Sequence, residues 1–176
     1  MNKTHFMRLL LATLLLGAQP LLAQTCSNSV TATAPDSRYT DNLDGTVTDN
    51  QTGLMWRQCS EGLSTTDTAC DTGSAVPYTW QVALQQVQTI NVTGFAGYTD
   101  WRLPNHNELT SLLENSCFSP AINTTAFPVT PAFNYWSASP HANLPGSAWY
   151  VSFNHGFVDS SNKTLAYRVR LVRGGQ

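Results

Sequence analysis

The chain has 176 residues, and 9 lysines and arginines against 11 aspartates and glutamates give a formal net charge of −2. This balance excludes the broad basic surface of nucleic-acid-binding domains. Only 11% of the residues are charged, against roughly 25% in typical domains. Such a weakly charged, hydroxyl-rich composition suits an exported protein, and the length allows one domain with one core.

The first residues follow the order of a secretory signal peptide. Lys3 and Arg8 precede an apolar run over residues 9–16, and Ala23 stands before a polar stretch. Because the run is shorter than the roughly 20 residues that span a bilayer, it predicts a cleaved signal peptide at residues 1–23. We therefore expect export to the periplasm, the cell surface or the medium, with no transmembrane anchor in the mature form. A permanent anchor is the alternative.

Residues 24–38 are small and polar without periodicity, which predicts an extended N-terminal segment. We expect a single domain over residues 39–176. Within it, the Asp-Gly pair at 44–45 signals a tight turn, and the runs at residues 46–48 and 54–56, which are joined by residues 50–53, have the composition of short paired strands. These features predict a β-hairpin.

Two helices are predicted in the middle of the chain. Apolar residues spaced i, i+3, i+4 and i+7 indicate a helix that opens at Thr79. Its buried face consists of Trp80, Ala83, Leu84 and Val87. A second helix is predicted from Asn105 as N-cap and Glu108 as its capping-box partner. Its buried face consists of Leu109, Leu112 and Leu113.

The last third of the chain predicts antiparallel strands. Strand-like runs occur at residues 135–138, 149–153, 157–158 and 167–172. In the last run Arg168 and Arg170 alternate with apolar residues, which indicates one buried face and one face toward solvent.

The four cysteines form an even set, and in an oxidising compartment such a set is expected to be paired. Three connectivities exist. Cys59–Cys70 is favoured because it closes a short polar loop, which leaves Cys26–Cys117 to tie the N-terminal segment to the domain. A zinc site is the alternative, but no Cys-x-x-Cys pair and no histidine pair at ligand spacing supports it.

Several ordered motifs carry a family resemblance. They lie at residues 44–49, 52–56, 100–105, 135–137 and 169–173. Their order resembles the bacterial family named after the C-terminal domain of the Legionella collagen-like adhesin, over about residues 39–173. The resemblance implies an α+β, C-type-lectin-like fold with two helices packed on a small twisted antiparallel sheet, here stapled by disulfides. In the adhesin the domain is a trimer that binds sulfated polysaccharides, whereas this chain has no collagen-like repeat and no large basic surface.

Two classes of enzyme are alternatives to a binding role. Residues 102–104 followed by an acidic helix also resemble the formylglycine-generating enzymes, but their copper-binding cysteine pair has no counterpart after Cys117, so we expect that activity to be absent. A hydrolase is the other class. Its candidate bases and nucleophiles are His106, His141 and His155 with Ser137, Ser152 and Ser160. No Gly-x-Ser-x-Gly motif places one beside another in sequence.

Four residues are candidate ligand contacts. Arg168 and Arg170 belong to a basic stripe on the last predicted strand, which suits an anionic ligand; solvated arginines paired with acidic residues are the alternative. Trp101 and Arg102 follow one another in a predicted loop, where an indole stacks well on a sugar ring. The alternatives are a core position for Trp101 and an internal ion pair between Arg102 and Asp100.

Asp41, Asp44 and Asp49 around a turn are weak candidates for calcium ligands, because calcium prefers clustered carboxylate oxygens. Their spacing does not match an EF-hand loop. The alternative is that Asp44 makes the turn and the other carboxylates are solvated. The sequence therefore predicts no cofactor.

The leading interpretation is an exported bacterial binding module of adhesin-like character that recognises polysaccharide or an extracellular protein partner at a surface, and that is not an enzyme. A structural or accessory subunit of an extracellular assembly, which would form homo-oligomers, is the alternative. A hydrolase is the third hypothesis.

Overall fold

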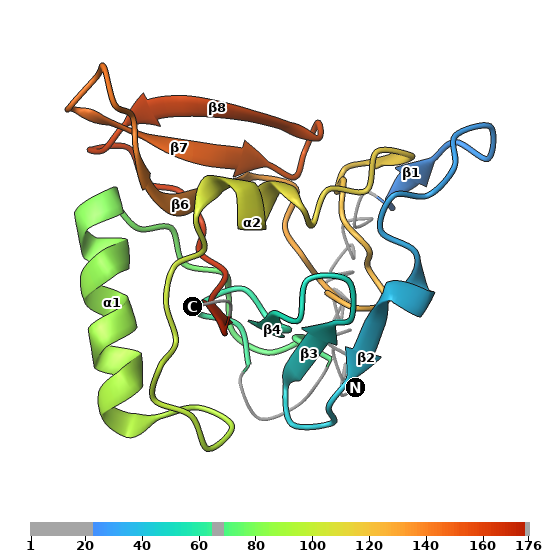
Figure 1. Ribbon diagram of the computed structural model, residues 1–176, viewed down its shortest axis with the longest axis horizontal. Coiled ribbons are helices and arrows are strands. Elements are labelled where there is room, and N and C mark those ends of the chain that lie inside the picture. Colours follow the sequence, from blue (N-terminus) through green and yellow to red (C-terminus); the bar gives the residue numbers. More distant parts are fainter. Residues whose placement is uncertain (1–22, 65–68, 175–176) are drawn as a thin grey trace, which may run out of the picture.

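The computed structural model describes residues 23–64 and 69–174 (Figure 1). Apart from Ala23, the predicted signal peptide lies outside these residues. In the described part of the chain, no helix has the length and apolar character needed to cross a membrane.

The described strands form three antiparallel sheets. The four-stranded sheet has the order β2 (Tyr39–Asp41), β3 (Thr46–Asp49), β4 (Met55–Arg57) and β9 (Val172–Arg173). The three-stranded sheet has the order β6 (Asn134–Pro140), β7 (Ser147–Ser152) and β8 (Phe157–Asn162). A two-stranded ladder joins β1 (Thr25–Cys26) to β5 (Cys117–Phe118). The described helices are α1 (Trp80–Thr93), α2 (His106–Thr110) and a short 3-10 helix (Asp36–Arg38).

The expected architecture of two helices packed on one small sheet is wrong. The described strands are divided among three sheets, and the helices are short, with 14 residues in α1 and 5 in α2. Helix α2 packs against β6 and β7, while α1 stands at one side of the molecule beside β6 (Figure 1). Periodicity identifies single strands but not their partners, and β9 pairs with β4 although Met55 and Arg173 are 118 positions apart.

The predicted β-hairpin is confirmed. Strand β3 pairs with β4, and Val47 lies opposite Trp56. Gly45 precedes β3 with a φ of 81°, in the left-handed region that glycine adopts without a steric penalty. Trp56 is also paired with Val172 of β9, so the end of the chain closes this sheet.

Both predicted helices are present. Helix α1 begins directly after Thr79 and ends at Thr93, where Gly94 caps it with a φ of 73°. The capping box of α2 is formed as predicted: the Asn105 side chain accepts from the Glu108 amide at 2.9 Å, and the Glu108 carboxylate accepts from the Asn105 amide at 2.7 Å. The box satisfies two of the amide groups that a helix start leaves without partners.

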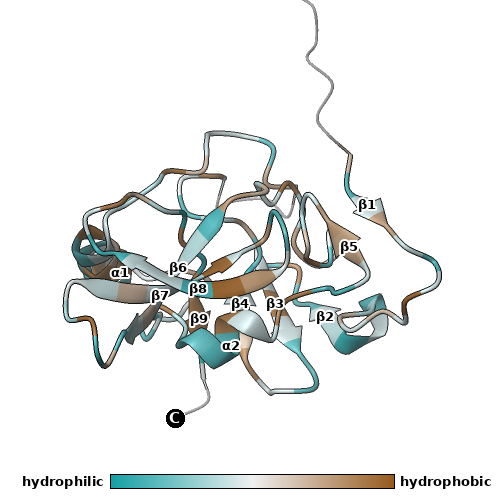
Figure 2. Ribbon diagram, turned by 90° about the horizontal axis from the view of Figure 1, so that it is seen from above, coloured by the Kyte–Doolittle hydropathy of each residue, from teal (hydrophilic) through white to brown (hydrophobic). Residues whose placement is uncertain are grey.

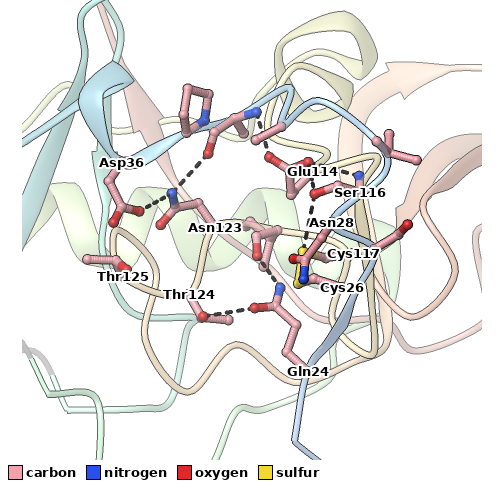
Figure 3. A pocket seen from close by; sticks show the side chains of 16 residues that line it. Gln24, Cys26, Asn28, Asp36, Glu114, Ser116, Cys117, Asn123, Thr124 and Thr125 are labelled. Atoms are coloured by element: carbon pink, nitrogen blue, oxygen red, sulfur yellow. Dashed lines mark hydrogen bonds between the residues drawn. A yellow bond between two sulfur atoms is a disulfide. The ribbon is translucent and has the colours of Figure 1, made fainter.

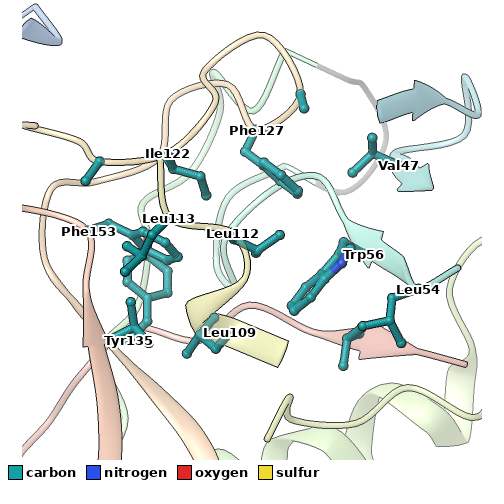
Figure 4. Packing of buried hydrophobic residues seen from close by; sticks show 14 residues of the cluster. Val47, Leu54, Trp56, Leu109, Leu112, Leu113, Ile122, Phe127, Tyr135 and Phe153 are labelled. Atoms are coloured by element: carbon teal, nitrogen blue, oxygen red, sulfur yellow. The ribbon is translucent and has the colours of Figure 1, made fainter. Parts of the chain in front are cut away.

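The main core lies between the hairpin, α2 with the turn that follows it, and the loop before β6 (Figure 4). Its largest fully buried apolar side chains are Trp56, Leu109, Leu112, Ile122, Phe127, Tyr135 and Phe153. Complete burial of one such side chain contributes roughly 1.5–3 kcal/mol. Leu112 lies just beyond α2, so the predicted apolar face extends past the helix itself.

A second cluster fills the space between α1 and the three-stranded sheet. Its buried members are Ala83, Trp101, Leu103, Trp136, Ala148, Tyr150, Val169 and Leu171. The Trp136 indole donates to the Tyr78 carbonyl at 3.0 Å, and the half-buried Trp80 indole donates to the Ser137 carbonyl at 2.9 Å. The indole N–H groups of both tryptophans therefore have hydrogen-bond acceptors.

Both predicted disulfides are present, Cys26–Cys117 and Cys59–Cys70. The first one links β1 to β5, where Cys26 and Cys117 are also cross-strand partners. Figure 2 shows β1 and β5 together at the side of the molecule away from α1, and Figure 1 shows β1 on that side as well. The disulfide therefore ties the N-terminal segment to one end of the domain.

Buried polar contacts hold the rest of that segment in place (Figure 3). The buried Glu114 carboxylate accepts from the amides of Thr33, Ala34 and Ser116 at 3.1, 2.8 and 2.8 Å. The Asn123 amide donates to the Ala34 carbonyl at 2.9 Å. These groups line a hollow of about 480 Å³, and because they are bonded to one another we assign the hollow a structural role.

Besides the exposed Asp100, whose pKa the hydrogen bonds from Arg173 lower, three carboxylates of the fold have lowered pKa values. Burial raises the pKa of Asp49, but the paired hydrogen bonds from Arg38 outweigh it, and the net shift is downward. The same competition between burial and the Arg102 ion pair lowers the pKa of Glu108. In Glu114 the hydrogen bonds that the carboxylate accepts outweigh the effect of burial. Each of these groups is therefore more acidic in the folded chain than in the unfolded one.

These shifts predict a loss of stability in acid. A carboxylate whose folded pKa is depressed stabilises the fold fully above its unfolded pKa of about 4, and that contribution disappears as the pH falls through the folded pKa. Burial raises the pKa of Glu61, which contributes with the opposite sign. Because four carboxylates have lowered pKa values and one has a raised pKa, we expect the urea midpoint to be constant between about pH 5 and 7 and to fall below about pH 4. A midpoint that rises on acidification would contradict this expectation.

Candidate binding groove

A groove of about 500 Å³ opens where the ends of three segments meet beside the three-stranded sheet. We call it the Arg168 groove. Its main lining residues are Phe133, Asn134, His155, Phe157, Tyr167 and Arg168. They come from the start of β6 and the loop before it, from the turn between β7 and β8 and the start of β8, and from the segment that leads to β9. The groove thus combines one guanidinium group, aromatic rings and amides.

The position of Arg168 is set by its backbone. Its amide donates to the Asn134 carbonyl at 2.9 Å, and its carbonyl accepts from the Trp136 amide at 3.0 Å, so the residue lies along the outer side of β6. Its guanidinium lies 4.5 Å from the ring centroid of Phe133, which is 56% exposed. Among the described arginines, four form an ion pair with a carboxylate: Arg38, Arg57, Arg102 and Arg173. Arg170 is buried in the core, and Arg168 has no carboxylate partner. Its positive charge is therefore open to a ligand.

Ring contacts hold the aromatic side chains of the groove against one another and against the buried Tyr150. The His155 ring stacks on Phe157 with the centroids 6.4 Å apart and the planes at 9°. Tyr150 contacts both Phe157 and Tyr167 edge to face, at 6.1 and 5.0 Å. Edge-to-face pairs add about 0.5–1.5 kcal/mol beyond buried area. These packed rings offer flat surfaces on which a sugar ring can stack, and their side chains have little conformational freedom left to lose on binding.

Arg170 is not on the surface stripe that the sequence indicates. It is 0% exposed, and its guanidinium donates to the Arg57 and Gln58 carbonyls and to the Thr130 hydroxyl. Burial lowers the pKa of Arg170 to about 10, so the group still carries its charge at neutral pH. Residues 169–171 are packed on both faces, which is why strand alternation misplaces this side chain. Arg170 organises the core and cannot contact a ligand directly.

Trp101 and Arg102 also serve the fold. Trp101 is 1% exposed, and its indole donates to the Phe95 carbonyl at 3.1 Å. Trp101 is therefore a core residue and not a ligand contact. Arg102 forms a two-point ion pair with Glu108 at 2.8 and 2.9 Å. The anticipated pair between Arg102 and Asp100 is wrong, because Asp100 binds Arg173 at 2.8 Å.

The three candidate calcium ligands do not converge. Asp49 is fully buried against Arg38. The Asp44 carboxylate accepts from the Thr46 amide at 3.0 Å, and the Asp41 carboxylate accepts from the Leu43 amide at 2.8 Å. Each carboxylate thus stabilises its own turn or ion pair. Across residues 23–64 and 69–174, no group of three or more His, Cys, Asp or Glu side chains is arranged to hold a metal ion.

Two of the candidate histidines form an arrangement that the sequence does not indicate. The rings of His106 and His141 both stack on Trp149, with centroids 5.5 and 5.0 Å away. His106 Nδ1 lies 3.3 Å from the Ser139 hydroxyl, a serine outside the predicted set. The third, His155, is hydrogen-bonded to Asn154 in the Arg168 groove. No local motif signals the stack, because its members come from α2, the turn after β6, and β7.

Comparison with known families gives one clear result. The sequence pattern of the family described as the Lcl C-terminal domain matches residues 45–173. Comparison with curated proteins gives no match. The matched range contains all the lining residues of the Arg168 groove, the hairpin and both α-helices. The chain therefore belongs to the Lcl C-terminal domain family, as its ordered motifs predict, and is an adhesin-related module.

Proposed function

We propose that this protein is an exported binding module that recognises polysaccharide through the Arg168 groove. The observation that carries the proposal is the Arg168 guanidinium, which has no carboxylate partner in the described chain and lies over the exposed ring of Phe133. A cation without an acidic partner, beside an exposed aromatic ring, suits a sugar that carries a negative charge.

The groove chemistry explains how such a ligand would bind. A carboxylate or sulfate on the sugar accepts charge-assisted hydrogen bonds from Arg168, worth about 1.5–3 kcal/mol. Sugar hydroxyls can bond to the Asn134 amide, and the ring can lie on Phe133 or Phe157. Because the groove offers a single charged contact, we expect weak binding at one site. Homo-oligomers on a repetitive polysaccharide would then bind far more tightly through several sites.

Export and a role other than catalysis are parts of the same proposal. Two disulfides among four cysteines support an oxidising compartment, in the periplasm, at the cell surface or in the medium. In the groove, the His155 ring is stacked on Phe157 and bonded to Asn154. A general base beside a nucleophile would have a different geometry, and this favours recognition over hydrolysis.

The test is binding of purified protein to a glycan array, followed by affinity measurements on the retained polysaccharide. Arg168→Ala is expected to weaken binding at least about tenfold, since loss of a charge-assisted contact costs about 1.4 kcal/mol or more. Lys163→Ala is the matched control, because Lys163 follows β8 away from the groove and contacts the Trp80 ring and the Pro145 carbonyl. Unchanged affinity of Arg168→Ala would refute the groove as the site. Retention of no polysaccharide by the wild type would refute the proposed function.

A further inference from the structure

A second hollow adjoins the Arg168 groove. It has a volume of about 780 Å³ and shares the lining residues Ala132, Phe133 and Asn154 with the groove. Phe133 is thus a wall of both hollows, and its exposed ring stands between them. A ligand seated on Arg168 that extends across Phe133 enters the second hollow. The volume of the second hollow lies within the range of roughly 300–1,000 Å³ that is usual for small-molecule sites.

The apolar lining residues of this second hollow are Pro120, Val129, Pro131, Ala132, Phe133 and Ala23, and Ala23 is the last residue of the predicted signal peptide. Its polar lining side chains are already bonded to the protein. The Ser119 hydroxyl donates to Asn154 at 2.8 Å, and the Thr130 hydroxyl donates to the Phe127 carbonyl at 2.7 Å. The Gln24 amide donates to the Pro120 and Ile122 carbonyls. What remains for a ligand is therefore mostly apolar surface.

The backbone of the wall is strained at the residue that faces the hollow. Val129 has a φ of 48° and is 46% exposed. A β-branched residue rarely adopts this left-handed conformation, and such strain persists where surrounding contacts impose it, often around bound ligands. Here Thr130 supplies those contacts, since its hydroxyl also accepts from the buried Arg170 at 2.7 Å. Arg170 thus positions the loop that presents Val129.

We propose that the Arg168 groove continues over Phe133 into this apolar subsite, and that its ligand is an anionic saccharide carrying an apolar substituent such as an acyl or aryl group. The inference rests on the proposed polysaccharide binding and names the class of sugar. The open charge of Arg168 at the junction selects the anionic group. The paired polar side chains beyond Phe133 leave an apolar surface, which selects the substituent.

The experiment compares two ligands that share one anionic sugar, methyl β-D-glucuronide and p-nitrophenyl β-D-glucuronide. Dissociation constants are measured by NMR titration with the full chain as processed by an exporting host. The wild type is expected to bind the p-nitrophenyl ligand about tenfold more tightly, from partial burial of the aryl ring. Val129→Asn is expected to reduce this ratio to about twofold or less, with methyl glucuronide affinity unchanged. Asparagine tolerates a positive φ, so the melting temperature should not decrease.

The matched control is Leu144→Asn, because Leu144 is 52% exposed in the turn between β6 and β7 and lines neither hollow. It should keep the tenfold preference. Equal affinity of the wild type for both ligands overturns the apolar subsite, and so does an unchanged preference in Val129→Asn. Binding of polysaccharide but of neither glucuronide overturns the inferred ligand class. In each of these cases the array and Arg168→Ala still report separately on the proposed function.

Discussion

Arg170→Met is expected to lower the free energy of unfolding by about 3–5 kcal/mol, enough to leave the domain partly unfolded at 37 °C. The guanidinium satisfies the Arg57 and Gln58 carbonyls and the Thr130 hydroxyl inside the core. Methionine fills much of the volume but leaves these acceptors buried without donors, and each orphaned group costs about 1–3 kcal/mol. The loss of the desolvated charge offsets part of this cost.

Urea unfolding followed by tryptophan fluorescence measures the effect. Arg168→Met is the matched control, since it makes the same change two positions earlier, at a side chain that faces the groove. We expect that variant to lose less than about 1 kcal/mol, from its contact with Phe133. Equal stabilities of the two variants would show that the buried hydrogen bonds of Arg170 contribute no net stability.

Removal of the Cys26–Cys117 disulfide is expected to have the second large effect on the free energy of unfolding. The double variant Cys26→Ser with Cys117→Ser frees a loop with a sequence separation of 91. On the chain-entropy account its loss costs about 4–5 kcal/mol, against about 3 kcal/mol for the Cys59–Cys70 loop with a separation of 11. Differential scanning calorimetry of the two double variants checks the order. A larger loss for Cys59 and Cys70 would contradict the prediction.

This disulfide also bears on ligand binding. Gln24 lies two residues before Cys26 and lines the apolar subsite, where its amide is bonded to the Pro120 carbonyl. With the disulfide absent, the β1–β5 ladder has only two pairs of residues to hold this wall. We therefore expect the double variant to lose the preference for the p-nitrophenyl ligand before it loses binding of the methyl ligand.

Features that depend on neighbours in the chain were predictable. The hairpin follows from two short strand-like runs on either side of the turn at residues 50–53, the capping box from Asn105 and Glu108 three residues apart, and helix α1 from its apolar spacing. The disulfide pairing followed from loop lengths and an even number of cysteines. Each of these signals arises from interactions within a few residues or from simple counting, so a single sequence contains them in full.

The candidate site was only partly predictable, and Arg168 and Arg170 show why. Both arginines occupy the same phase of an apparent strand, so the sequence treats them alike. In the structure, residue 168 bridges to Tyr135 of β6 while the Leu171 carbonyl accepts from the Arg57 amide of β4, and different neighbours cover each position. One guanidinium consequently stands open beside Phe133, and the other is enclosed by loop carbonyls.

The sequence by itself determined the family, the local elements and the disulfides, because ordered motifs and short-range spacing specify them. Only the tertiary structure decided the division into three sheets, the burial of Trp101 and Arg170, and the meeting of Phe133 and Arg168 at one groove. These features depend on contacts between residues far apart in the chain. Hydrophobic burial drives such contacts, but it is non-directional. The periodicity of one segment therefore does not identify the segment against which it packs.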